Sequence, residues 1–121
     1  MTTALDHYRL LGRSGLRVSP MALGTMTFGI DKAWGTDETE ARRIVDHYAE
    51  RGGNSIDTAN FYADGGSERM LGKILKDRRH RFVIASKYTL TTARGDPNAS
   101  GNQRKSMMRA VEDSLRRLDT D

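Results

Sequence analysis

The sequence contains no cysteine, so disulfide bonds and thiolate metal sites are excluded. It also lacks any apolar run close to the roughly 20 residues that a membrane-spanning helix requires. Residues 1–9 have no apolar core of the kind found in signal peptides, and we therefore expect a cytoplasmic protein without a membrane partner. Neither a G-x-G-x-x-G fingerprint nor a P-loop is present, so neither glycine-rich nucleotide motif applies.

Histidine is scarce, and His7, His47 and His80 follow no metal-ligand spacing. We therefore expect no metal site and no catalytic role for these three residues. Basic residues are in excess, with 20 Lys and Arg against 16 Asp and Glu and a formal net charge of +4. They are divided between residues 76–81 and 104–117, with acidic residues among them. This distribution is typical of solvated helix faces, and it disfavours nucleic-acid binding.

Hydrophobic residues make up 36% of the sequence, which is low for an independent globule of 121 residues. The chain nevertheless alternates between short apolar runs and segments with helical spacing. Residues 8–11 and 16–19 flank a glycine-containing connection and predict a β-hairpin. Three strands then follow, at residues 21–26, 54–59 and 81–88, and a loop and a helix follow each. This alternation predicts an α/β fold with parallel strands covered by helices.

Polar side chains stand where the predicted helices begin. Asp37 and Glu40 have the spacing of a capping box. Ser67 is a candidate cap for the second helix, and Asn102 is one for the third, which runs over residues 103–118. The third helix is expected to have one apolar face, made of Met108, Val111, Leu115 and Leu118.

The carboxyl ends of parallel strands are where functional groups gather in α/β proteins. Asp57 lies near the end of the second strand and Lys87 at the end of the third. Adjacent strands are about 4.8 Å apart, so the two side chains can meet. A carboxylate in an otherwise buried run requires such a partner. The pair is either a structural salt bridge at the rim of the sheet or part of a reactive site.

Tyr62 follows in the loop after the second strand. A phenol near an ammonium group is biased toward its ionised form, because its pKa falls. It can then exchange a proton with an oxygen that gains negative charge. The alternative is a loop aromatic packed on its neighbours, which spacing alone favours for Tyr62.

Two glycine-containing segments are weaker candidates for ligand contact. Gly24 and Thr25 place bare backbone at the end of the first strand, where a ligand can approach closely. Residues 65–67 precede a helix and have the composition of an anion site. A simple helix entry turn is the favoured interpretation of residues 65–67.

The strand-end residues resemble those of the aldo-keto reductases, and the resemblance spans nearly the whole chain. Its most specific part is residues 54–62, with Asp57 and Tyr62 five positions apart, followed by Gly66-Ser67-Glu68 and Leu71-Gly72. Residues 84–88 resemble the strand that carries the family lysine, and residues 8–19 resemble the family's N-terminal hairpin. The pattern is most similar to the branch that contains potassium-channel-β-like proteins and bacterial oxidoreductases.

The resemblance implies the N-terminal part of a (β/α)8 TIM barrel, with residues 8–19 as the hairpin and residues 21–121 as the first three βα units. It implies NADPH-dependent reduction of an aldehyde or ketone, although the choice between NADPH and NADH stays open. In this scheme Tyr62 is the general acid, Lys87 lowers its pKa and Asp57 holds Lys87. The residues expected near the cofactor are Gly24, Thr25, Met26 and Asp57, and those expected at the substrate pocket are Phe28 and Trp34.

The resemblance also implies a fourth catalytic residue, a histidine at the end of a fourth strand, which none of the three histidines matches. We therefore expect residues 1–121 to be an inactive portion of the enzyme, without the C-terminal half of the barrel. Such an open sheet is expected to self-associate through its exposed edges. The alternative function is a non-catalytic regulatory or interaction subunit with the same fold.

Overall fold

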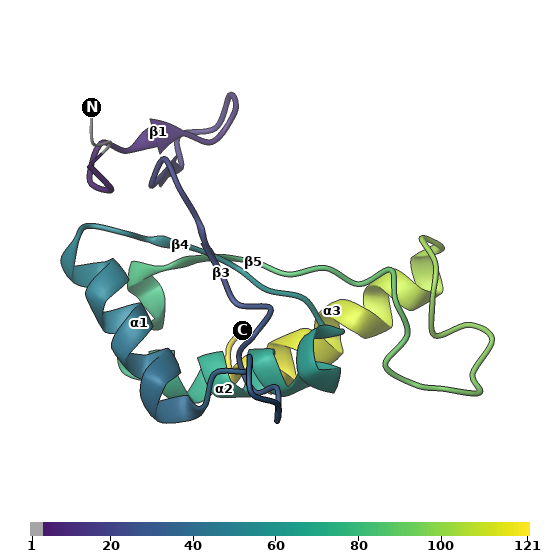
Figure 1. The fold of residues 1–121 in the computed structure, drawn as a ribbon. Coiled ribbons are helices and arrows are strands. Elements are labelled where there is room, and N and C mark those ends of the chain that lie inside the picture. The colour runs from purple at the N-terminus through teal and green to yellow at the C-terminus, as the bar shows by residue number, and fades with distance from the viewer. Residues whose placement is uncertain (1–3) are drawn as a thin grey trace.

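The structure is a computed structural model, and it describes residues 4–121. A two-stranded hairpin is followed by three strands, and a helix follows each strand along the chain (Figure 1). The three strands form one parallel sheet, and α1 and α2 lie together on one side of it (Figure 1). The predicted α/β organisation with an N-terminal hairpin is therefore confirmed.

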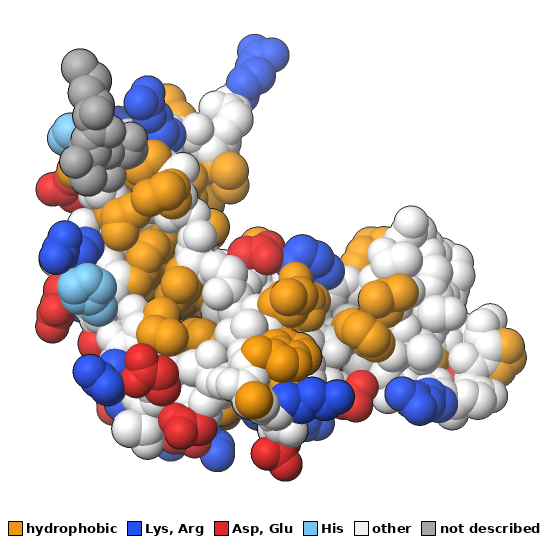
Figure 2. Space-filling model, viewed as in Figure 1, with side chains coloured by type: hydrophobic (Ala, Val, Ile, Leu, Met, Phe, Trp, Pro, Cys, Tyr) orange, Lys and Arg blue, Asp and Glu red, His pale blue; other side chains and the backbone are white. Residues whose placement is uncertain are grey.

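The hairpin consists of β1 (Arg9–Leu10) and β2 (Arg17–Val18), which pair antiparallel. Gly12, in the connection between them, has a φ of +59°, a conformation that favours glycine. Ser19 ties the hairpin to the body of the molecule, because its backbone N–H donates to Asn54 Oδ1 at 2.8 Å. Figure 2 shows the hairpin as an arm that projects from the body and exposes hydrophobic side chains.

The sheet has the order β3 (Leu23–Gly24), β4 (Ser55–Asp57) and β5 (Val83–Ala85). Gly24 lies beside Asp57, and Asp57 lies beside Ala85. These strands are shorter than the apolar runs predicted. Phe82, for example, is buried although it precedes β5, because an apolar run marks burial and not ladder pairing. Within residues 4–121 the sheet has two open edges and does not close.

The helices are α1 (Glu38–Glu50), α2 (Gly66–Leu75) and α3 (Arg104–Leu118), and two short 3₁₀ turns, η1 (Tyr62–Gly65) and η2 (Arg79–Arg81), precede α2 and β5. Asp37 caps α1 as predicted, since its carboxylate accepts from Glu40 N–H at 2.9 Å. The main core lies between the sheet and the helices, and its buried members are Phe28, Ala41, Val45, Tyr48, Ala49, Ile56, Leu71, Ile74, Leu75, Phe82 and Leu118.

Two of the predicted caps are wrong. Gly65, not Ser67, is the N-cap residue of α2, and it has a left-handed φ of 85°. Ser67 lies inside the first turn, where its hydroxyl faces the sheet. Gln103 caps α3 by accepting from Ser106 N–H at 2.9 Å, whereas Asn102 accepts from Thr89. Both side chains proposed as caps were drawn into other contacts that sequence spacing does not reveal.

The predicted apolar face of α3 is only partly right. Leu118 is buried, but Met108 and Val111 are exposed. The face that is buried instead consists of Ser106, Ala110, Ser114 and Leu118. These residues recur every fourth position, and three of them are small. The helix thus turns small side chains inward, which lets it approach α2 closely.

At Gly72, α2 packs directly against the backbone at the end of α3. A Cβ at Gly72 would lie 2.8 Å from the carbonyl oxygen of Leu118. Gly72→Ala is therefore expected to destabilise the fold, although alanine favours a helix by about 0.8–1.0 kcal/mol. Overpacking costs about 1–3 kcal/mol, so we expect a net loss of about 1 kcal/mol in chemical denaturation. A more stable variant would contradict this account of the contact between the helices.

Candidate active site

Strand alternation brings Asp57 and Lys87 together. Asp57 lies beside Ala85, and Lys87 is two residues further along, so both side chains emerge on the same face of the sheet. Lys87 Nζ lies 2.7 Å from Asp57 Oδ2, and the two side chains are 51% and 39% exposed. The predicted ion pair is therefore present, on the face of the sheet opposite that of Ile56, which packs in the core with residues of α1 and α2.

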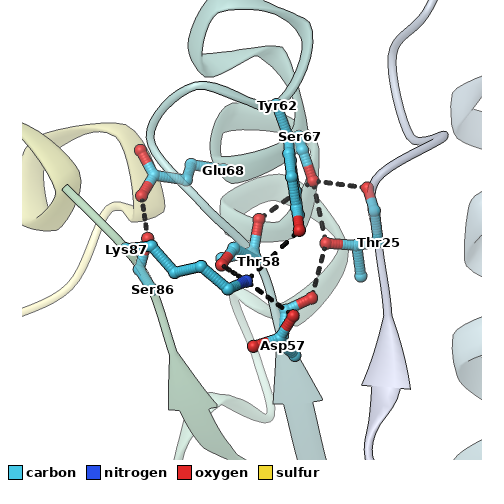
Figure 3. A network of polar contacts seen from close by, with 8 residues as sticks. All are labelled: Thr25, Asp57, Thr58, Tyr62, Ser67, Glu68, Ser86 and Lys87. Atoms are coloured by element: carbon cyan, nitrogen blue, oxygen red, sulfur yellow. Dashed lines mark hydrogen bonds and ion pairs between the residues drawn. The ribbon is translucent and has the colours of Figure 1, made fainter. Parts of the chain in front are cut away.

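Lys87 contacts three oxygens, which matches the three N–H donors of an ammonium group. Besides Asp57, Nζ donates to the Thr58 carbonyl oxygen at 2.8 Å and to the Tyr62 hydroxyl at 3.3 Å (Figure 3). Nζ also lies 4.9 Å from the centroid of the Tyr62 ring, within the range of a cation–π contact. These contacts hold Lys87 beside the Tyr62 hydroxyl.

The pKa of Lys87 is raised above its usual value. Burial is the largest single influence and lowers this pKa, but hydrogen bonds to Asp57 and Tyr62 and the charges of both groups together outweigh it. Lys87 is therefore an ammonium at neutral pH, and it presents a positive charge to the Tyr62 oxygen.

Tyr62 begins the short turn η1, and its backbone N–H donates to the Ala59 carbonyl at 3.2 Å. The next two residues, Ala63 and Asp64, both have a φ of 51°. Non-glycine residues in this left-handed region cost about 1–3 kcal/mol each, and such conformations cluster at functional sites. The sharp turn brings the Tyr62 ring back over the end of β4, next to Lys87 (Figure 3).

The residues expected near a cofactor occupy different environments. Gly24 has open space where a Cβ would point, and the Met26 side chain is 56% exposed. Thr25 is fully buried, and its hydroxyl donates to the Asp57 carbonyl oxygen at 3.0 Å. Ser67 in turn donates to the Thr25 hydroxyl and carbonyl oxygens, both at 2.9 Å. The backbone of Thr25 is occupied as well, since its N–H donates to the Asp57 carbonyl oxygen at 3.0 Å and its carbonyl oxygen accepts from Phe28 N–H at 3.1 Å.

Phe28 and Trp34, the residues expected at a substrate pocket, also differ in how far they are buried. Phe28 is 2% exposed and belongs to the hydrophobic core, so its ring does not line an open surface. Trp34 is 56% exposed. Of the two, only Trp34 is exposed on the surface, and its place at a substrate pocket stays a prediction.

A second ion pair, which sequence analysis missed, lies behind the site. Glu68 of α2 is fully buried, and its Oε2 lies 2.6 Å from Arg117 Nε of α3. Its other oxygen accepts from the Ser86 hydroxyl at 2.5 Å, directly before Lys87 (Figure 3). The sequence signal was a glutamate in the first turn of a helix, which is ordinarily a dipole contact at the surface.

Among residues 4–121, no three His, Asp or Glu side chains are grouped as metal ligands. No helix in the same range has the length and apolar character needed to cross a bilayer.

Several known proteins are similar to this chain in sequence. Norsolorinic acid reductase of Aspergillus flavus is 39% identical, with 98% of this chain and 34% of the relative aligned. The NADP(+) aryl-alcohol dehydrogenase of Phanerodontia chrysosporium is 41% identical, with coverage of 94% and 33%. The chain thus spans about one third of the length of these relatives.

Solved structures agree with these relatives. The holo form of aldo-keto reductase AKR11C1 from Bacillus halodurans is 40% identical, with a TM-score of 0.79 over 94% of this chain and 37% of the other. An aldo-keto reductase from Klebsiella pneumoniae in complex with NADPH is 31% identical, with a TM-score of 0.67 over 87% and 33%. The fold is that of the first three βα units of the (β/α)8 barrel, as the resemblance implied. Residues 20–121 match the model of the Aldo/keto reductase family, and the chain belongs to that family.

Proposed function

We propose that Asp57, Tyr62 and Lys87 carry the proton transfer in NADPH-dependent reduction of an aldehyde or ketone, in a protein of the relatives' full length. The observation that supports this most directly is the Lys87 ammonium, which donates to the Tyr62 hydroxyl while Asp57 holds it at 2.7 Å. A salt bridge that served only the fold would not require a phenol at its third donor position. Relatives of this chain carry the names of a reductase and of a dehydrogenase.

The proposed step uses each of these side chains differently. A hydride adds to the carbonyl carbon, and the π electron pair moves to the carbonyl oxygen, which takes the Tyr62 hydroxyl proton. Lys87 stabilises the phenolate that remains, because its positive charge faces that oxygen. Asp57 keeps Lys87 charged and oriented. The product is an alcohol, and Tyr62 is reprotonated from solvent.

NADPH would supply the hydride in this scheme. The chain fits its nicotinamide end, since Gly24 leaves open space at the strand end and Met26 and Asp57 are accessible beside it. One solved relative is described as a complex with NADPH, and one curated relative is named with NADP(+). These residues carry no positive charge, so they offer nothing specific to the phosphates of a dinucleotide.

Titration of the 121-residue chain with NADPH tests whether these residues contact only the nicotinamide end of the cofactor. We expect weak or undetectable binding, because the described strand ends provide contacts to only one end of the cofactor. Binding is followed by the fluorescence of NADPH and by quenching of Trp34, the only tryptophan. Tight binding would contradict the proposal that the phosphate and adenine contacts lie outside these residues.

The catalytic role itself is tested by Asp57→Asn in a full-length protein that contains these residues. The variant keeps the shape of the side chain but removes the charge that holds Lys87, so NADPH-dependent reduction of a panel of aldehydes should fall. Glu38→Gln is the matched control, since Glu38 pairs with Lys73 on the exposed surface. Equal activity of the two variants would contradict the proposal.

A further inference from the structure

In the residues that directly follow each of the three strands, side chains still alternate between the two faces of the sheet. Asp57 and Lys87 emerge on the open face. Thr25, Thr58 and Ser86 lie one residue after Gly24, Asp57 and Ala85, the last residues of β3, β4 and β5, and all three contact α2. Each strand end therefore has a hydroxyl on the helix side.

The first turn of α2 contacts all three hydroxyls. The Ser67 oxygen lies 2.9 Å from that of Thr25 and 3.0 Å from that of Thr58, and Glu68 accepts from Ser86 at 2.5 Å (Figure 3). Thr25, Thr58, Ser67 and Glu68 are each 0% exposed. Because no water reaches these four residues, their hydrogen bonds are satisfied within the cluster, whereas Ser86 lies at its exposed edge.

Glu68 is the charged member of this cluster, and its burial is costly. A fully buried carboxylate is retained only with a counter-ion and hydrogen bonds that satisfy its oxygens. Arg117 and Ser86 supply these, one on each oxygen. Gly65 makes room for Arg117, since a Cβ there would lie 2.7 Å from Arg117 Cδ. Arg117 of α3 thus fixes the carboxylate on one side, and on the other side the carboxylate accepts from the Ser86 hydroxyl just beyond β5.

We propose that Ser86 and Glu68 are positioning residues for Lys87. Ser86 is hydrogen-bonded on the helix side of the strand end, so the next residue, Lys87, is held on the open side with its Nζ at Asp57 and Tyr62. Arg117 fixes Glu68 and so connects α3 to the site. This proposal rests on the function proposed above in one respect, which is that Lys87 belongs to a reactive site. The position of Lys87 itself can be measured without any catalytic assay.

Ser86→Ala in the 121-residue chain tests this inference, because it removes the link to Lys87 and leaves the Glu68–Arg117 pair intact. Competitive acetylation with acetic anhydride, read by mass spectrometry, reports the reactivity of Lys87 against exposed Lys73. Without the Ser86 hydroxyl, Lys87 should lose contacts that keep its amine protonated. Acetic anhydride reacts only with the unprotonated amine, so we expect the relative acetylation rate of Lys87 to rise several-fold. Ser86→Thr keeps a hydroxyl and should restore the wild-type rate.

Two further variants complete the experiment. Ser55→Ala removes a hydroxyl from the start of β4 and should leave Lys87 labelling unchanged. Ser86→Val also lacks the hydroxyl and leaves the Glu68–Arg117 pair intact, so it should raise Lys87 labelling as Ser86→Ala does, which preserves the test if one variant does not fold. Wild-type labelling of Lys87 in folded Ser86→Ala would overturn the positioning role. The proposed function would be overturned by a different result, namely normal turnover in an Asp57 or Tyr62 variant. The two proposals can therefore fail independently.

Discussion

Tyr62→Phe is expected to lower NADPH-dependent carbonyl reduction by roughly 100- to 10,000-fold in a full-length protein that contains these residues, which is the usual contribution of a positioned general acid. The substitution removes one oxygen and keeps the ring over Lys87, so the fold around η1 should survive. Turnover is measured by the disappearance of NADPH absorbance with an aromatic aldehyde as substrate.

Cofactor binding distinguishes proton transfer from a structural role in this variant. Tyr62 is proposed to move a proton and not to hold NADPH, so the dissociation constant should be close to that of the unmodified protein. Tyr88→Phe provides a matched control, because it removes a second phenol, which directly follows Lys87 in the sequence. Near-normal turnover of Tyr62→Phe would refute the mechanism, whatever its effect on binding.

Glu68→Ala is expected to lower the free energy of unfolding by about 3–5 kcal/mol, because it leaves the Arg117 charge without its partner. The Arg117 side chain is only 13% exposed, so water compensates little for the lost carboxylate. Ser86 loses its acceptor at the same time. Urea denaturation followed by circular dichroism measures the change.

Two comparisons show whether the buried charge is responsible. Glu38→Ala breaks an exposed pair with Lys73 and should cost less than about 1 kcal/mol. The double variant Glu68→Leu with Arg117→Leu removes both charges and should regain much of the stability, since an apolar pair avoids the desolvation cost. A Glu68→Ala variant as stable as Glu38→Ala would contradict the assignment of this pair as a buried support.

Local sequence patterns were sufficient to predict the order of elements. Alternation of apolar runs with helical spacing predicted the hairpin and the three βα units, because secondary structure has a period that the sequence displays directly. Asp37 and Glu40 marked the start of α1 correctly for the same reason, since a cap acts over three residues. The extent of the strands was less predictable, because apolar residues such as Phe82 are buried without joining the ladder.

The meeting of Asp57 and Lys87 was also predictable, whereas Tyr62 was expected beside them only from the resemblance to the aldo-keto reductases. Parallel strands end at one edge of a sheet, and the alternation of side chains determines which face each residue takes. Asp57 and Lys87 were therefore expected to be neighbours, and the structure places them 2.7 Å apart. The catalytic use of this group stays a prediction until Tyr62→Phe is measured.

The sequence by itself thus determined the fold and the polar group on the open face of the sheet. Only the tertiary structure decided what lies behind that group: the burial of Thr25 and Phe28, and the contacts of Ser67 and Glu68. The physical reason is the range of the interactions. Strand and helix periods act over a few neighbouring residues, whereas Glu68 and Arg117 are 49 positions apart and meet only when α3 packs on α2.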